Sequence, residues 1–429
     1  MSHVRILPPD IIAKIAAGEV VERPASVLKE LLENALDAKA TSIDILVKDA
    51  GKSLIRVTDN GSGIAHDDIA RLFHRHATSK ISSLQDLYHI TSLGFRGEAL
   101  YSIGAISHIR LSSKTKTEPH GWEIHLRGNE RIDLKPSATT DGTEIEVQEL
   151  FFNTPARKKF LKSNTSELNA LVDTSIPYAL LYPAVHMRFT HNEKTLFDAA
   201  PNKSLIDRIG TTLGLDPKDL IEGERDFEQK RYTIRFVLGD INIQRTRKDM
   251  QFIFINNRPV QNASIRYHIN DIYRLLLSHG VYPFFCAYLR VPHEEIDVNV
   301  HPTKREVKIK DEATLMSHLR RFAEELLMTR SKAKQADKTI FTMPQPDTQP
   351  EFSSAQPSFP AGGNKLPFET TRLLFESTPS SSQTDAPLRK KLENCRFIGN
   401  LLQTYLLFET EDSMLVIDQH AAAERVSFE

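Results

Sequence analysis

The pattern of apolar and polar positions divides the chain into three stretches. Residues 1 to about 330 alternate helix-like and strand-like periodicities, with a change of pattern near 210–225. From Ser331, prolines recur among Ser, Thr and Gln, and such a segment buries too little apolar surface to offset its ordering entropy. Folded character resumes near Cys395. We therefore predict four segments: 1–215, 216–330, a flexible linker over 331–391, and 392–429.

Short apolar runs beside turn residues predict most strands of these segments, and alternation of apolar with polar residues predicts the strand at 296–300. After the linker, two expected strands surround a short turn, and a strand pair with one helix cannot form a stable core alone. We therefore expect the chain to stop inside a domain. The expected strands are 43–47, 54–57, 232–237, 252–255, 296–300, 404–408 and 414–417, and helices are expected over 24–38, 100–106 and about 264–278.

The expected helix at 24–38 carries the first candidate chemistry. Pro24 suits a first helical turn, and one face is apolar. The opposite face gathers Glu30, Glu33, Asn34 and Asp37 at spacings of three and four residues. A solvated face would explain these residues equally well. Asn34 favours a ligand site, because Asn is a poor residue for an exposed helix interior and its amide oxygen suits a hard cation.

Glycine-bearing turns supply further candidates. The turn at 59–64 follows a strand and contains residues that tolerate positive φ, which suits either a plain surface turn or close approach to a ligand. Gly94 and Gly97 precede the expected helix at 100–106, where free N–H groups favour phosphate. The segment 74–80 adds cations and hydroxyls. Neither a Walker loop nor a Rossmann fingerprint is present.

Composition narrows the class of protein. The formal net charge is −1, so a nucleic-acid partner would have to be bound by a local basic cluster. The two cysteines, Cys286 and Cys395, are too few and too far apart for a disulfide framework or a four-cysteine zinc site. Residues 1–19 do not resemble a secretory signal, and the sequence has no apolar run of membrane length. We expect a cytoplasmic protein without a membrane partner.

Four motifs in chain order resemble the nucleotide motifs of the gyrase, chaperone, histidine-kinase and MutL (GHKL) ATPase superfamily. They are Glu30-x-x-x-Asn34, Asp59-x-Gly61-x-Gly63, residues 94–100 and Gly142-Thr143. Residues 15–24, 152–160 and 298–304 are similar to MutL proteins in particular. The resemblance covers residues 4 to about 330 and resumes near 395. It implies an α+β protein: a Bergerat-type (GHKL) ATPase sandwich, a ribosomal-S5-like α/β transducer domain, a disordered linker, and the start of an α+β dimerisation domain.

The resemblance also implies roles for residues in an ATP site. Glu30 would be the general base that deprotonates the attacking water, and Asn34 would bind Mg²⁺. Asp59 would accept a hydrogen bond from the adenine amine, supported by Thr143 and Gly63. Guanine presents an acceptor there instead, which would cost on the order of 1–3 kcal/mol.

A phosphate cover and a second-domain cation complete the implied site. Lys304, from the second domain, would reach the γ-phosphate and sense its presence, although a solvated loop lysine is the alternative. The residues that would cover the phosphates are Thr78, Ser79, Lys80, Gly94, Phe95, Arg96 and Gly97.

The last twelve residues are similar to the metal-binding endonuclease motif of MutL proteins that nick DNA. Asp418, His420 and Glu424 are the candidate ligands, with Mn²⁺ or Zn²⁺ as the metal. A charged helix start would explain the same residues. The remaining ligands of that family lie further downstream, so we do not expect this chain alone to nick DNA.

Basic residues of the second segment, Arg258 and Arg266 among them, would help to line a DNA groove that closes when two N-terminal domains meet. Such binding is directed to phosphates and is sensitive to salt. The implied partners are a second copy of the chain, mismatched DNA delivered by a MutS-type recognition protein, a sliding clamp and a helicase. The implied location is cytoplasmic, with association to the nucleoid during repair.

The preferred hypothesis is an ATP-gated clamp of DNA mismatch repair with weak Mg²⁺-dependent ATPase activity. An ATP-regulated nicking endonuclease and a scaffold that binds nucleotide without hydrolysing it are the alternatives. A histidine kinase would lack a second domain with a residue like Lys304. A topoisomerase or chaperone would lack the stretch 152–160.

Overall fold

The computed structural model describes residues 8, 17–18, 20–80, 92–94, 97–227, 232–297, 308–339, 396–401, 405–409 and 414–418. The chain divides into two compact units, Met1–Met343 and Pro344–Glu429.

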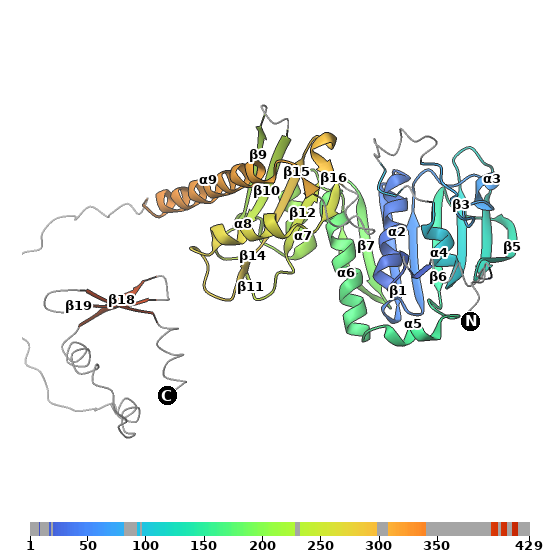
Figure 1. The fold of residues 1–429 in the computed structure, drawn as a ribbon, viewed down its shortest axis with the longest axis horizontal. Coiled ribbons are helices and arrows are strands. Elements are labelled where there is room, and N and C mark those ends of the chain that lie inside the picture. Colours follow the sequence, from blue (N-terminus) through green and yellow to red (C-terminus); the bar gives the residue numbers. More distant parts are fainter. Residues whose placement is uncertain are drawn as a thin grey trace, which may run out of the picture. The chain divides into compact units, whose positions relative to one another are not determined.

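An eight-stranded sheet forms the N-terminal half of the first unit, as the described residues show it (Figure 1). The strands follow the order β5-β4-β3-β6-β2-β1-β7-β8. Neighbours are antiparallel except β1 and β7, which are parallel. The strands are β1 (Ser42–Lys48), β2 (Leu54–Asp59), β3 (His108–Lys114), β4 (Gly121–Arg127), β5 (Glu130–Ser137), β6 (Gly142–Gln148), β7 (His186–His191) and β8 (Lys194–Ala199).

Helices cover one face of this sheet. Along each strand, every second side chain points toward that face, and these side chains are mostly apolar. Ile55 and Val57 of β2 are buried there, in one core with the apolar side chains of α2. A short 3-10 turn, η1 (Asp49–Gly51), joins β1 to β2. The helices are α2 (Pro24–Asp37), α3 (His66–Ile69), α4 (Ala99–Ala105), α5 (Pro155–Phe160), α6 (Asn164–Leu181) and α7 (Leu205–Leu213).

The opposite face of the sheet carries an ionic network. Arg110 contacts Glu123 at 2.8 Å, and its guanidinium also lies 3.6 Å from Glu146. Burial works to raise the pKa of Glu123, but hydrogen bonds from His125, Arg110 and Ser112 lower it to about 2. Because its polar groups already bond to one another, this face needs no helical cover.

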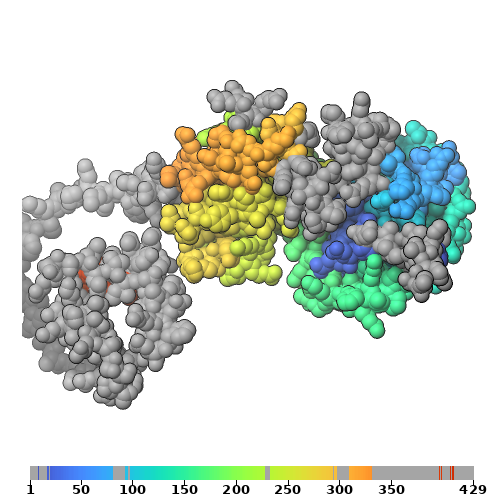
Figure 2. Space-filling model, in the orientation of Figure 1, coloured from blue at the N-terminus to red at the C-terminus, as the bar shows by residue number. Residues whose placement is uncertain are grey.

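A second, five-stranded sheet has the order β13-β12-β15-β10-β9. β12 and β15 are parallel, and the other pairs are antiparallel. Two helices pack on one face of it and lie side by side, in yellow and orange in Figure 2. The strands are β9 (Leu220–Phe227), β10 (Tyr232–Gly239), β12 (Gln251–Ile255), β13 (Arg258–Val260) and β15 (Phe285–Arg290), and the helices are α8 (Ala263–Tyr273) and α9 (Glu312–Thr339).

Two short strand pairs and two 3-10 turns complete the described part of the first unit. In the pairs, β11 (Gln244–Arg245) bonds to β14 (Tyr282–Pro283), and β16 (Ile296–Asp297) bonds to β17 (Lys308–Ile309). The turns are η3 (Pro217–Asp219) and η5 (His293–Glu295).

The two sheets are joined by helices α6 and α7, which pack on the other face of the second sheet. Leu180 of α6 and Ile209 of α7 share a core with Val237, Phe254 and Cys286. Burial raises the pKa of the Cys286 thiol, which is free. Since α6 also packs on α2, it links the first core to the second.

Arg208 of α7 is fully buried at this junction. Its guanidinium donates to the main-chain carbonyls of Ala179, Val185, Ala199 and Ala200. Burial lowers the pKa of Arg208 to about 10, still far above neutral, so the group remains charged. Four carbonyls from three chain segments therefore take the place of a counter-ion.

The second unit shows three antiparallel strands in its described residues, in the order β18-β19-β20. They are β18 (Arg396–Leu401), β19 (Tyr405–Glu409) and β20 (Met414–Asp418). The strands predicted at 404–408 and 414–417 are confirmed within one residue, and β18 is an additional strand that the sequence pattern did not reveal.

The other predicted elements are confirmed with two corrections. The helix predicted to 278 ends at Tyr273, and residues 274–276 form a turn instead. The linker predicted from 331 is wrong at its start, since α9 continues to Thr339. Residues 331–339 contain Lys, Ala and Gln but no proline, and these residues favour a helix. Beyond Asp297, residues 298–300 of a predicted strand lie outside the described residues.

Within the described ranges, no helix combines the length and the apolar character that crossing a bilayer requires.

Candidate functional site

A cavity of about 1640 Å³ lies along the polar face of α2. This volume exceeds the roughly 300–1,000 Å³ of ordinary small-molecule pockets, so the cavity has room for a nucleotide. The cavity extends to residues of the second sheet. The residues that the sequence predicted and that line it are Glu30, Asn34, Gly63, Thr78, Ser79, Lys80, Gly94, Gly97, Arg258 and Arg266.

α2 positions the first of these side chains because its other face is anchored. Val27, Leu28 and Leu32 are completely buried, which fixes the rotation of the helix. Glu30 and Asn34 then lie one turn apart on the cavity side. The solvated-face interpretation of this helix is thereby disfavoured, because its polar residues face a cavity and bonded partners rather than bulk water.

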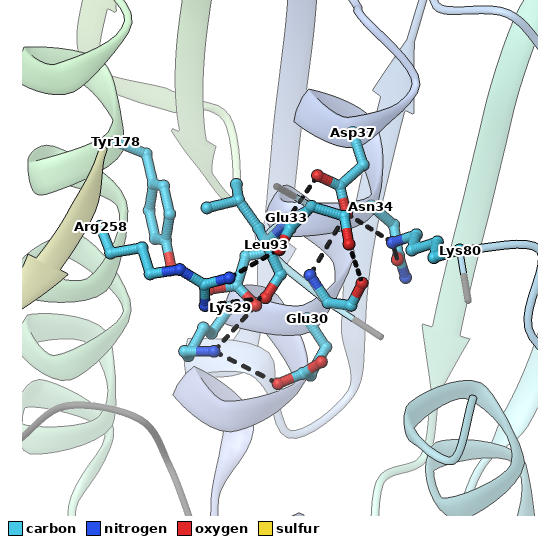
Figure 3. Close-up of polar contacts among 11 residues, drawn as sticks. Lys29, Glu30, Glu33, Asn34, Asp37, Lys80, Leu93, Tyr178 and Arg258 are labelled. Carbon is cyan, nitrogen blue, oxygen red and sulfur yellow. Dashed lines mark hydrogen bonds and ion pairs between the residues drawn. The ribbon is translucent and has the colours of Figure 1, made fainter. Parts of the chain in front are cut away.

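In the middle of α2, a lysine holds two carboxylates (Figure 3). The Lys29 ammonium lies 2.9 Å from Glu33 and 3.3 Å from Glu30. The buried Tyr178 hydroxyl donates to the other oxygen of Glu33 at 2.7 Å. Burial alone would lower the pKa of Lys29, but the two carboxylates raise it above its usual value. Glu30, with a quarter of its side chain exposed, is the carboxylate of this pair that is accessible from the cavity.

One turn further along, Asp37 organises a second cluster (Figure 3). The Lys80 ammonium lies 2.9 Å from the Asn34 amide oxygen and 2.5 Å from Asp37 Oδ2. The main-chain N–H groups of Leu93 and Gly94 donate to the same carboxylate, at 2.9 and 3.3 Å. Asp37 thus joins the helix to both segments that the sequence assigned to a phosphate cover.

The second sheet reaches this cluster through Arg258. Its guanidinium donates to the carbonyl oxygens of Ser92 and Leu93, at 2.6 and 3.2 Å. Arg266 also lines the cavity, and its buried Nε has no hydrogen-bond partner among the described atoms. The assignment of both arginines to DNA stays a prediction, but the Arg258 contacts show that its guanidinium is engaged within the molecule.

Glycines permit the close packing around the cavity. Gly97 has φ +62°, and a Cβ there would lie 2.5 Å from the carbonyl oxygen of Ala77. Gly63 has φ +70°, and a Cβ would lie 2.0 Å from the carbonyl oxygen of Lys114. Any side chain at either position would displace backbone, which explains why both turns need glycine.

Asp59 and Thr143 are aligned partners on β2 and β6, on the helix-covered face. Burial raises the pKa of Asp59 to about 6, against the opposing effect of hydrogen bonds from the N–H groups of Gly61 and Thr143. The Thr143 hydroxyl lies 2.9 Å from that of Ser113. Both Asp59 and Thr143 line a separate cavity of about 180 Å³, so the structure does not bring them into the large cavity with Glu30 and Asn34.

Several predicted residues lie outside the described residues, namely Phe95, Arg96, Lys304, His420 and Glu424. Asp418 is the last residue of β20, and nothing further is described for its side chain. Among the described residues, no group of three or more His, Cys, Asp and Glu side chains could hold a metal ion.

Two sequence models match the chain and define its class. Residues 22–150 match the model described as histidine kinase-, DNA gyrase B-, and HSP90-like ATPase. Residues 218–328 match the model described as DNA mismatch repair protein, C-terminal domain. Together with a mixed sheet that helices cover on one face, the first match defines an ATPase of the GHKL class, which supports ATPase activity.

Relatives that match over nearly the whole length of this chain identify the family. The MutL protein of Syntrophotalea carbinolica is 35% identical, over 99% of this chain and 75% of that protein. The MutL protein of Trichlorobacter lovleyi is 38% identical, over 100% of this chain and 73% of that protein. The solved structure "Aquifex aeolicus MutL ATPase domain complexed with ADP" matches with a TM-score of 0.50 and 27% identity, over 64% of this chain and 93% of that one. The chain belongs to the MutL family of DNA mismatch repair proteins.

Sequence reasoning missed Tyr178 and Lys29, and it assigned Arg258 only to DNA. Tyr178 contacts Glu33 across 145 positions, and Arg258 contacts Leu93 across 165. Neither contact carries a local signal, because a tyrosine in a helix and an arginine at the start of a strand are ordinary residues. Lys29 was visible in the sequence, next to Glu30 and four residues before Glu33, and this spacing could have revealed it.

Proposed function

We propose that this chain is an ATP-gated clamp of mismatch repair, which binds Mg²⁺-ATP along α2 and hydrolyses it slowly. The observation that carries the proposal is that Glu30 and Asn34 face one cavity together with Thr78, Ser79 and Lys80. A relative's ATPase domain was solved with ADP, which supports adenine nucleotide as the ligand.

In the proposed site, Glu30 deprotonates the attacking water, while Lys29 and the helix hold it in place. Asn34 provides an oxygen ligand to Mg²⁺. The fit is supported by the present partner of that oxygen, the Lys80 ammonium at 2.9 Å, because the amide already points at a cation. When bound, the metal would neutralise phosphate charge, and few protein ligands would suffice for it.

Asp59 and Thr143 are proposed to recognise adenine. Asp59 supplies the acceptor for the exocyclic amine, and its main-chain hydrogen bonds fix its direction. Gly63 lines the cavity beside this turn.

The phosphates are proposed to bind beneath the residues of the predicted cover, with Phe95, Arg96 and Lys304 contributing from outside the described residues. The domains of the proposed clamp are an ATPase domain over 1–215 and a transducer domain from 216. A second copy of the chain and DNA would be the partners, with DNA phosphates bound by Arg266 and the basic residues near it. A MutS-type protein, a sliding clamp and a helicase remain proposed partners, and a cytoplasmic location is proposed with them.

The test of the catalytic assignment is single-turnover phosphate release with calorimetric nucleotide binding. Glu30→Ala should bind ATP and lose turnover by about 10²–10⁴-fold, because the base is gone. Glu22→Ala, an exposed acid that also lines the cavity, is the matched control and should hydrolyse ATP normally. Normal turnover by Glu30→Ala would refute the base assignment. No phosphate release by the wild-type chain would favour the non-hydrolysing scaffold.

A second test addresses the clamp. Gel filtration with a non-hydrolysable ATP analogue should show a nucleotide-dependent shift from monomer to dimer, and Asn34→Ala should abolish the shift by preventing Mg²⁺-ATP binding. The proposed endonuclease site at Asp418, His420 and Glu424 needs a separate experiment, a Mn²⁺-dependent nicking assay on a longer chain with Glu424→Ala as the control.

A further inference from the structure

We propose that the Lys80 ammonium occupies the Asn34 amide oxygen and must leave it before Mg²⁺ can bind there. In this proposal, Arg258 of the second sheet determines how readily Lys80 leaves. This inference rests on the proposed function and concerns the regulation of the same site. It connects the metal ligand on α2 to the second sheet through a continuous series of contacts.

The first contact means that Lys80 and Mg²⁺ cannot bind the Asn34 amide oxygen at the same time. Lys80 Nζ lies 2.9 Å from Asn34 Oδ1. A magnesium ion bound to that oxygen at about 2.1 Å would lie within about 5 Å of the ammonium, and two such charges in a partly buried site repel each other strongly. Lys80 must therefore leave Asn34 before the metal can bind.

The second contact holds Lys80 where it is. Asp37 Oδ2 lies 2.5 Å from the ammonium, with only 13% of the Asp37 side chain exposed. The same carboxylate accepts hydrogen bonds from the N–H groups of Leu93 and Gly94. Its position, and with it the hold on Lys80, therefore depends on where residues 92–94 lie.

The third contact sets the position of residues 92–94 from the second sheet. Arg258 is the first residue of β13, and it donates to the carbonyl oxygens of Ser92 and Leu93. The planar guanidinium can bind two acceptors at once, whereas a lysine ammonium is a point charge without that fork. Arg258 and Asp37 thus both form hydrogen bonds with main-chain groups of residues 92–94.

It follows that the Mg²⁺ concentration needed for binding depends on the contact of Arg258 with residues 92–94. With Arg258 in place, Asp37 and Lys80 stay together and the metal meets competition. When the second sheet withdraws Arg258, the 92–94 segment loosens, and Lys80 becomes free to move from Asn34 toward the phosphates. A movement of the second sheet would in this way prepare the site for Mg²⁺-nucleotide.

The experiment is calorimetric binding of ADP to the full chain across a series of Mg²⁺ concentrations, so that no turnover is involved. In Lys80→Met, the Mg²⁺ concentration for half-maximal enhancement of ADP affinity should fall about ten- to a hundredfold, the range that corresponds to losing a hydrogen bond made by a charged group. Lys194→Met, an exposed lysine at the start of β8, is the matched control and should behave as wild type.

Arg258→Lys tests the coupling with the positive charge retained. It should lower the Mg²⁺ requirement in the wild-type background, by a smaller factor than Lys80→Met. In the Lys80→Met background it should have no further effect, because the cation that it tunes is gone. Arg274→Lys at the end of α8, where the arginine pairs with Asp271, is the control for general effects.

Each outcome is decisive. If Lys80→Met weakens ADP binding equally with and without Mg²⁺, Lys80 is only a phosphate ligand and the inference is overturned. Additive effects of Lys80→Met and Arg258→Lys would equally overturn the coupling. If the wild-type chain binds no ADP at any Mg²⁺ concentration, the proposed function itself fails, which is a different result.

Discussion

The polar face of α2 and the buried Arg208 solve the same physical problem in different ways. Both place ionised groups away from bulk water. On α2, the carboxylates and the amide are held mainly by long side chains, Lys29 and Lys80. Arg208 is held by four main-chain carbonyls from α6, from the segment before β7, and from the end of β8.

The difference separates a working site from a structural one. A lysine side chain can rotate away from its partner at the cost of a few torsions, so a ligand can replace it. A main-chain carbonyl moves only when its helix or strand moves. Exchangeable partners therefore mark the ligand site, and fixed partners mark the joint between the two cores.

The largest expected effect concerns Arg208. Arg208→Met should reduce the free energy of unfolding by more than about 3 kcal/mol, because four buried carbonyls lose their donor. Chemical denaturation followed by circular dichroism would measure the loss. Arg188→Met is the matched control. Arg188 pairs with Asp44 on the sheet surface with about half of its side chain exposed, and its loss should cost less than about 1 kcal/mol. Equal effects for both variants would show that Arg208 is not the structural anchor of the comparison.

Asp59 should combine features of both regions, since its partners are main-chain groups but its proposed ligand is adenine. Its pKa is about 6 in the fold and 3.8 ordinarily, so folding favours the protonated form. The ionised carboxylate therefore destabilises the fold above pH 6, and this cost disappears as the pH falls toward 4.

Asp59→Asn should accordingly stabilise the protein by on the order of 2–3 kcal/mol at pH 8, and the gain should fade between pH 6 and 4. The same variant should lose adenine-nucleotide binding. In the wild type, ADP affinity should fall as the pH drops through about 6, which titration calorimetry would detect. A stabilisation that does not change with pH would contradict the assigned cause.

The sequence predicted the parts of this comparison unequally. The polar face of α2 was predictable because Glu30, Asn34 and their neighbours are close in sequence and the 3.6-residue period places them together. The anchoring of Arg208 was not, because carbonyls carry no sequence identity. Its acceptors belong to alanines and a valine that resemble any other apolar residue.

The fold shows the same division. Apolar runs located β1, β2, β10 and β12, because each strand buries apolar side chains on one face or on both. The order of the strands did not follow from these runs. The parallel pairing of β1 with β7 joins segments more than a hundred residues apart, whose apolar side chains share one core with α2 and α6. The family resemblance supplied the architecture that periodicity could not.

Tyr178→Phe should have an intermediate effect. The Tyr178 hydroxyl donates to the buried Glu33, which keeps its ion pair with Lys29. Losing a hydrogen bond to a charged group should cost about 1.5–3 kcal/mol of unfolding free energy. Tyr288→Phe is the control, because that hydroxyl donates to the neutral carbonyl of Leu180 at 3.3 Å and should cost less. A larger loss for Tyr288→Phe would mean that charge does not govern the contacts of α2.

The smallest change in stability should come from the residue with the largest proposed effect on turnover. Glu30 is a quarter exposed, and Lys29 retains its closer partner, Glu33, when Glu30 is removed. Glu30→Ala should therefore shift the free energy of unfolding by less than about 1 kcal/mol. Denaturation of Glu30→Ala and of Arg208→Met in one experiment compares the ligand site on α2 with the structural site at Arg208. A loss of several kcal/mol for Glu30→Ala would mean that Glu30 is a structural residue, and its contact with Lys29 would then belong with the fixed partners of Arg208.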